Sequence, residues 1–304
     1  MAVFQFHGLC PATHTPFSAD GALYLAAVEV QARYLLARGV DRVFIGGTTG
    51  ESASLSLEER MALGDRWAEV ARSTGIRVAV HVGAQCLSDA AALAAQAQRN
   101  KACAVSMVAP SYFKPRSIGD LVACCAQVAS AAPALPFYYY DIAPLTGIHF
   151  AVDEFLGVAA KRIPNLAGVK YSNPDLGSFL LGKRFEEGRF DIPWGIDEYF
   201  LSALVMGAKG GVGSTYNFAP GPVQRILAAF SEGDLAACQT EQARVMQMVR
   251  IVAKRGYMGC AKALMTHLGV PVGPARLPNS NPDAAGVEAM LGELEAIGFF
   301  SWKD

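Results

Sequence analysis

Lys170 ends a short apolar run, LAGVKYS at residues 166–172, where a charged side chain is out of place. A neutral amine at such a position can attack a ketone and form a Schiff base. Apolar surroundings disfavour the ammonium form and so increase the nucleophilic fraction of the amine. A lysine at a strand end can equally extend its amine into solvent, and this segment alone leaves both interpretations open.

The sequence GGTTGE at residues 46–51 combines glycines with two hydroxyls, those of Thr48 and Thr49. Glycines let a ligand approach the backbone, and successive N–H groups and hydroxyls can cradle a carboxylate. The alternative is a turn whose glycines only supply a positive φ. A carboxylate-binding loop is therefore a hypothesis that needs support from neighbouring groups.

The segment YYYD at residues 138–141 supplies a candidate proton carrier. In a strand, Tyr138 and Tyr140 lie on one face and Tyr139 on the other. If Tyr140 points inward at the end of its strand, its phenol lies near Lys170 and can relay protons. Aromatic strand residues are also common in cores, so this interpretation depends on its neighbours.

Three further segments follow apolar runs. The acids Asp197 and Glu198 suit a polyhydroxylated ligand, although Asp197 can also cap a following helix. GGVGST at residues 210–215 is another glycine-rich loop with hydroxyls, and SYFK at residues 111–114 places aromatic side chains after another run. If one rim collects all of these groups, it suits a 2-keto acid with a hydroxylated tail.

Apolar runs alternate with helix-like segments along the first two thirds of the chain. The expected strands are residues 7–13, 40–47, 76–83, 103–110, 136–141, 166–172, 191–196 and 209–215. The expected helices are residues 23–39, 56–75, 88–102, 117–132, 151–162 and 197–208, the second opening with a capping box of Ser56 and Glu59.

This alternation predicts an α/β fold, a (β/α)8 TIM barrel over residues 1–230. Residues 231–304 read as helices and form a C-terminal helical extension of the same domain. The chemistry of such barrels lies at the C-terminal ends of the strands. The candidate residues named above all lie at those ends or in the loops that follow them.

Composition excludes several classes of function. The 304 residues carry a net charge of −1 without a basic cluster, so neither nucleic acid nor a membrane surface is an expected partner. No signal-like segment opens the chain, and the cytoplasm is the expected location. Seven cysteines and five histidines lack the spacings of metal sites, so no metal or other cofactor is expected.

These segments resemble the N-acetylneuraminate lyase / dihydrodipicolinate synthase superfamily of class I aldolases, over essentially the whole chain. GGTTGE resembles the pyruvate-carboxylate loop of that superfamily, YYYDIAPLTG the tyrosine segment, GVKYS the Schiff-base lysine segment and GAKGGVGSTYN the glycine-rich segment. Leu145 stands where dihydrodipicolinate synthases usually place an arginine, and residues 195–198 fit a G-x-D-E pattern. Both features resemble the sialic acid lyase branch.

The resemblance implies a role for each candidate. Lys170 is the implied Schiff-base nucleophile and Tyr140 the proton relay, while Thr48 and Thr49 bind the substrate carboxylate. The implied sugar-tail pocket is formed by Ser172, Gly195, Asp197, Glu198 and Ser214. Tyr112 is implied to enter a neighbouring subunit's site and complete a Thr-Tyr-Tyr hydrogen-bond chain, in a homo-oligomer that is usually a tetramer.

The implied activity is reversible cleavage of N-acetylneuraminate to N-acetylmannosamine and pyruvate. A 2-keto-3-deoxy sugar-acid aldolase, a dehydratase of the same superfamily and a non-catalytic sialic acid- or pyruvate-binding barrel are the alternatives. The chain departs from its relatives beside the tyrosine, with Asp141 where Asn or His is common and a proline moved one place, to Pro144. These departures bear on the fine specificity.

Overall fold

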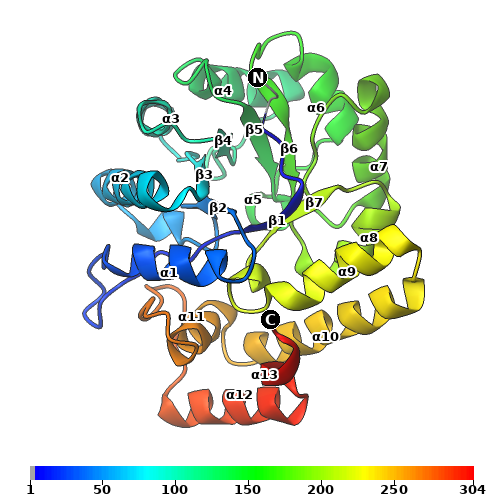
Figure 1. Ribbon diagram of the computed structural model, residues 1–304. Coiled ribbons are helices and arrows are strands. Elements are labelled where there is room, and N and C mark those ends of the chain that lie inside the picture. The colour runs from blue at the N-terminus through cyan, green and yellow to red at the C-terminus, as the bar shows by residue number, and fades with distance from the viewer. Residues whose placement is uncertain (1–3) are drawn as a thin grey trace.

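The computed structural model describes residues 4–304, so residues 1–3 of the expected barrel lie outside the described residues. A barrel of parallel strands forms its centre (Figure 1). The strands are β1 (Gly8–Pro11), β2 (Arg42–Ile45), β3 (Arg77–His81), β4 (Ala104–Met107), β5 (Phe137–Asp141), β6 (Leu166–Tyr171) and β7 (Gly210–Gly213). Strands β2 to β6 pair in chain order, and β1 pairs with β7. The predicted barrel is confirmed.

Single-residue bridges close the barrel between its two sets of paired strands. Trp194 bridges Tyr171 of β6 and Gly211 of β7. On the other side, Ala12 bridges Phe44 and so joins the end of β1 to β2. The expected eighth strand, residues 191–196, therefore lies where the sequence predicts, but as isolated bridges instead of a regular strand.

The irregularity of this closing segment has a local cause. Pro193 has no N–H to donate to a ladder, although its carbonyl accepts a bond of 2.9 Å from Tyr171. A Cβ added to Gly168 would lie 1.7 Å from the carbonyl oxygen of Asp191. The closing segment thus runs parallel to β6 and approaches Gly168 too closely for a side chain at that position.

Helices surround the barrel (Figure 1). They are α1 (Ala27–Leu36), α2 (Leu57–Thr74), α3 (Leu87–Arg99), α4 (Ile118–Ala129), α6 (Val152–Ala159), α7 (Leu176–Arg184), α8 (Phe200–Val205) and α9 (Pro220–Glu232). Shorter pieces are α5 (Ala143–Thr146), η1 (Ser52–Ser54), η2 (Phe185–Gly188), η3 (Asp197–Tyr199) and η4 (Thr215–Asn217). The capping box predicted for α2 is present, with bonds of 3.2 and 3.0 Å between Ser56 and Glu59.

Two helices differ from the sequence prediction. Helix α3 begins at Leu87 after Cys86, so Ser88 lies inside its first turn and does not cap it. Helix α7 was not expected, because its short sequence LGSFLLGKR includes two glycines. The side chain of Asp175 caps α7 by accepting a bond of 3.0 Å from the backbone of Ser178.

The C-terminal region is helical and packs on one side of the barrel (Figure 1). It contains α10 (Leu235–Ala253), α11 (Tyr257–His267), α12 (Ala284–Ala296) and α13 (Phe299–Trp302). The end of the chain returns to α9, where the backbone of Gly221 donates to the carbonyl of Lys303 at 3.0 Å. Among residues 4–304, no helix combines the length and apolarity that crossing a membrane requires.

The barrel interior is a compact cluster of large and small side chains. Tyr138 and Tyr140 of β5 pack there with Phe44 of β2 and Ala79 of β3. Tyr139 points the other way and packs against Phe155 of α6, with ring centres 4.8 Å apart. The predicted alternation along β5 is confirmed, and it places Tyr140 inside the barrel.

Candidate active site

Lys170 lies inside the barrel near the C-terminal end of β6, with 2% of its surface exposed. Its neighbour on β5, in register, is Tyr140. Its Nζ lies 3.8 Å from the ring centre of Tyr140 and 4.0 Å from that of Phe44. Within residues 4–304 no carboxylate forms an ion pair with this amine, and two aromatic faces pack against it.

The phenol of Tyr140 connects β5 to the loop after β2. Its oxygen lies 3.3 Å from Thr48 Oγ1. Its ring meets the rings of Phe44 and His81 edge-on, with centres 6.1 and 5.8 Å apart. The amine, the phenol and the Thr48 hydroxyl are therefore neighbours, as the sequence analysis expected.

Residues 46–51, called the glycine loop below, need their glycines for steric reasons. Gly46 has a φ of +62°, and a Cβ on Gly47 would lie 2.7 Å from the ring of Phe44. A Cβ on Gly50 would lie 3.0 Å from the backbone of Gly46. This tight path leaves the side chain of Thr48 exposed and buries that of Thr49. Such a loop presents hydroxyls and N–H groups suited to an anion.

His81 is a site residue that the sequence analysis did not name. Its Nδ1–H donates to the carbonyl of Gly46 at 2.8 Å, and its Nε2 accepts from the backbone of Val108 at 3.2 Å. Burial holds the pKa of His81 well below its usual value, so the ring is neutral. His81 thus fixes both the glycine loop and the ring of Tyr140. Its signal was the same as that of Lys170, a polar residue near the end of an apolar strand.

The candidates for a substrate tail meet at the closing segment and the loop after β7. Ser172 Oγ donates to the carbonyl of Gly195 at 3.2 Å. A Cβ on Gly195 would lie 2.0 Å from that hydroxyl and 3.2 Å from the carbonyl oxygen of Tyr171, so a side chain there would displace Ser172. Ser214 Oγ lies 2.7 Å from the phenol oxygen of Tyr257, a residue of α11 that the sequence analysis missed. Glu198, three residues after Gly195, is half-buried.

Asp197 joins the closing segment to the loop after β7. Its Oδ2 accepts from the backbone N–H of Thr215 at 2.8 Å and from its hydroxyl at 2.7 Å. Asp197 is the first residue of η3, and its side chain bonds Thr215 instead of capping that helix. Burial raises the pKa of Asp197 to about 6. Its contacts position two loops of the rim.

Tyr112 is separated from the other candidates in the single chain. Its side chain is 82% exposed and stacks edge-on against Phe113, which is 85% exposed. Its loop is held by Gln85, whose side-chain oxygen accepts from the backbone of Ser111 and Tyr112 at 3.1 Å each. The described residues therefore contain the Thr48–Tyr140 contact but no bond from Tyr112 to either of them.

The sequence matches the model of the dihydrodipicolinate synthetase family over residues 5–293. The chain belongs to this family. It is 43% identical to N-acetylneuraminate lyase A of Xenopus laevis over 278 residues, which cover 90% of each chain. It is 37% identical to the N-acetylneuraminate lyase of Rattus norvegicus over 309 residues, covering 99% of this chain and 96% of the relative. The resemblance inferred from the motifs is confirmed.

Solved structures of the family have the same architecture. The Proteus mirabilis N-acetylneuraminate lyase superposes with a TM-score of 0.93 at 34% identity, covering 97% of this chain and all (100%) of that one. A lysine-bound dihydrodipicolinate synthase from Cyanidioschyzon merolae superposes with a TM-score of 0.88 at 27% identity, covering 96% of this chain and 98% of that one. The barrel is thus common to both branches, whereas the more similar of these two structures is the lyase.

The departures beside Tyr140 are accommodated without disturbing β5. Pro144 falls in the first turn of α5, where a missing N–H leaves no bond unmade. Asp141 is buried, accepts from Asn173 Nδ2 at 3.2 Å, and has its pKa raised to about 6 by burial. Leu145, which stands where dihydrodipicolinate synthases usually place an arginine, is 66% exposed. Pro144 therefore lies in the helix after the strand, and Tyr140 stands in register with Lys170.

Proposed function

We propose that this chain is a class I aldolase that cleaves N-acetylneuraminate reversibly to N-acetylmannosamine and pyruvate. The observation that carries the proposal is the enclosed amine of Lys170, 3.8 Å from the ring centre of Tyr140, whose phenol meets Thr48 at 3.3 Å. Membership of the family and the similarity to curated lyases support the choice of substrate.

In this mechanism the Lys170 amine attacks the C2 ketone of the open-chain sugar acid to give a carbinolamine. Tyr140 donates its proton to the departing hydroxyl, which leaves as water, so that an iminium ion and a Tyr140 phenolate remain. The iminium withdraws electrons, Tyr140 accepts the proton of the C4 hydroxyl, and the C3–C4 bond breaks to release N-acetylmannosamine. The bond's electron pair remains as an enamine. Protonation at C3 and hydrolysis then release pyruvate and restore the amine.

The remaining candidates bind the two ends of the substrate. Thr48 and Thr49, with the N–H groups of the glycine loop, are proposed to hold the carboxylate. The tail of hydroxyls and the acetamido group are proposed to contact Ser172, Gly195, Asp197, Glu198 and Ser214. Contacts to the tail orient the ketone toward the amine, which lowers the entropic part of the barrier.

Pyruvate release from N-acetylneuraminate, followed with a coupled dehydrogenase, tests the proposal. We expect Lys170→Ala to reduce release to the uncatalysed background, because the variant lacks the amine that forms the iminium in this mechanism. Lys161→Ala, at an exposed lysine, is the matched control and should retain wild-type release. Near-wild-type activity of Lys170→Ala would contradict the mechanism.

Borohydride reduction in the presence of pyruvate separates the alternative functions. A stable mass adduct on Lys170 without release from N-acetylneuraminate would favour a 2-keto-3-deoxy sugar-acid aldolase or a dehydratase. The absence of both adduct and release would favour a binding barrel.

We further propose that the enzyme acts in the cytoplasm as a homotetramer, in which Tyr112 completes the hydrogen-bond chain of a neighbouring subunit. The exposed pair Tyr112 and Phe113 supports this, because exposed aromatic side chains are common at interfaces. The seven cysteines carry free thiols, which agrees with a reducing compartment.

A further inference from the structure

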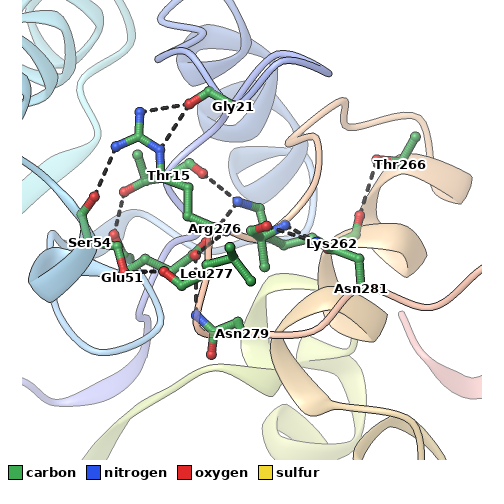
Figure 2. Close-up of polar contacts among 12 residues, drawn as sticks. Thr15, Gly21, Glu51, Ser54, Lys262, Thr266, Arg276, Leu277, Asn279 and Asn281 are labelled. Atoms are coloured by element: carbon green, nitrogen blue, oxygen red, sulfur yellow. Dashed lines mark hydrogen bonds and ion pairs between the residues drawn. The ribbon is translucent and has the colours of Figure 1, made fainter.

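A buried lysine outside the strand ends connects the C-terminal helices to the glycine loop (Figure 2). Lys262 of α11 is 0% exposed, and its Nζ donates to Glu51 Oε1 at 2.8 Å and to the carbonyl of Thr15 at 2.9 Å. The amine also lies 4.2 Å from the ring centre of Phe17. The proposed mechanism makes no use of this amine, so its burial requires another explanation.

Glu51, the last residue of the glycine loop, has a left-handed backbone with a φ of 54°. Such a conformation is unfavourable for a non-glycine residue, so its surroundings must hold it in place. Its Oε2 accepts from the backbone of Arg276 at 2.8 Å and from Asn279 Nδ2 at 3.3 Å. Both carboxylate oxygens are thus bound by the C-terminal region.

Two hydrogen bonds extend this restraint to the backbone of the loop on either side of Thr49. The backbone of Glu51 donates to the carbonyl of Thr48 at 3.0 Å. Thr15 Oγ1 donates to the carbonyl of Gly50 at 2.6 Å, while its own carbonyl accepts from Lys262. The C-terminal half of the loop is therefore fixed from α11 through a continuous set of hydrogen bonds.

Among residues 4–304, Glu51 is the ion-pair partner of Lys262, and the other charged or titratable groups nearby do not compete for it. Burial, followed by the charge of Lys262, lowers the pKa of the adjacent His14 to about 3, so that ring is neutral. The cationic Arg276 is itself bound by Glu59, at 2.6 and 2.8 Å. Because a buried ion pair adds little stability compared with apolar residues of the same size, stability does not explain its presence.

We propose that Lys262 and Glu51 are positioning residues through which α11 orients Thr48 and Thr49 and so sets the affinity of the site for the carboxylate of a 2-keto acid. The identity of that ligand rests on the proposed function. Neither residue touches the reacting atoms in the proposed mechanism. Their effect therefore belongs to pyruvate binding and not to the other reactant.

The test uses a double variant, Glu51→Gln with Lys262→Met, which removes both charges, so that no buried charge is left without its counter-ion. We expect its thermal unfolding to stay close to wild type. The pyruvate concentration that half-saturates borohydride trapping should rise about tenfold, because a misplaced loop loses its alignment with the carboxylate. The KM for N-acetylmannosamine in the condensation direction, and the maximal adduct yield, should not change.

Lys254→Met is the matched control, since it removes an exposed ion pair with Glu293 from the same region. It should leave both constants unchanged. If the double variant does not fold, Thr15→Val decides the question, with an expected rise of about threefold in half-saturation from the loss of one hydrogen bond to Gly50.

Wild-type half-saturation in the folded double variant, or in Thr15→Val, would overturn the positioning role. An equal rise in the KM for N-acetylmannosamine would also overturn it, because it would indicate a general loss of structure. The absence of any pyruvate adduct on wild-type Lys170 would instead overturn the proposed function. The two failures are therefore distinguishable.

Discussion

Asp197 is held by Thr215, yet its second oxygen, Oδ1, is buried without a hydrogen-bond partner among the described residues. Burial raises the pKa of this carboxyl from 3.8 to about 6. The folded state therefore binds a proton more tightly than the unfolded chain. The resulting stability is fully present below about pH 4 and is lost as the pH rises through about 6.

We predict that Asp197→Asn removes this pH dependence. An amide keeps an oxygen for the two bonds from Thr215 but carries no charge at any pH. Relative to wild type, the variant should gain on the order of 2 kcal/mol of unfolding free energy between pH 4.5 and 7.5. Denaturant unfolding of both proteins at the two pH values measures the difference. An identical pH response of the two proteins would contradict the shifted pKa.

The sequence predicted individual site residues where the chain itself carried the signal. Lys170 and Tyr140 lie at the ends of apolar runs, and the structure brings them together. His81 carried the same signal and was overlooked. The bonds from Thr215 to Asp197 could not be predicted, because they join segments separated by 18 positions and depend on how two loops meet.

At the scale of elements, the site depends on the register of β5 with β6. A register shift lies between Phe137 and Tyr138, after which Tyr140 stands opposite Lys170. A slip of one residue would turn either side chain out of the barrel. Gly168, two residues before Lys170, lets the closing segment lie close beside β6, and so it helps to maintain the position of that strand in the barrel.

Gly168→Ala is predicted to destabilise the fold severely. Its Cβ would lie 1.7 Å from the carbonyl oxygen of Asp191, a backbone atom that cannot move without opening the barrel. We expect a loss of several kcal/mol, or failure to fold, by analogy with overpacked cores. The matched control is Gly292→Ala in α12, where nothing lies within 4 Å and a small gain is expected. Similar melting temperatures for both variants would contradict the close approach of the Asp191 backbone to Gly168.

The order of strands and helices was predictable from the alternation of apolar and helix-like runs. Whether each expected strand forms a regular ladder was not predictable. The sequence of residues 191–196 predicts a strand. In the structure, Pro193 and the close approach to Gly168 interrupt the regular pairing, and the segment forms isolated bridges. Helix α7 escaped prediction because packing on the barrel, and not its own sequence, stabilises it. The contact of α11 with the glycine loop joins Glu51 to Lys262 across 211 positions, and no local pattern encodes it.

At the scale of the whole molecule, the exposed Tyr112 makes the proposed assembly testable by mixing subunits. Tyr112→Phe removes the hydroxyl proposed to act in a neighbouring site, and Lys170→Ala removes the nucleophile. Refolded together in equal amounts, some sites combine an intact Lys170 with a neighbour's intact Tyr112. For random assembly we expect about a quarter of wild-type activity, more than either parent alone supplies.

The control replaces the second subunit with a Lys170→Ala, Tyr112→Phe double variant, which offers no intact tyrosine. That mixture should remain as inactive as its parents. If the first mixture gives only the average of its parents, Tyr112 does not act between subunits.

The barrel closes through residues 191–196 instead of a regular strand, and the candidate site spans this closure. The continuous sheet from β2 to β6 contains His81, Tyr140 and Lys170, and Thr48 lies in the loop after β2. The pairing of these strands fixes the register of the three strand residues. Of the candidates for the substrate tail, Ser172 follows β6, whereas Gly195, Asp197, Glu198 and Ser214 lie in the closing segment, in η3 and in the loop after β7. We therefore expect substitutions at these tail positions to change which aldehyde is accepted, while Lys170 and Tyr140 retain the carbon–carbon bond chemistry.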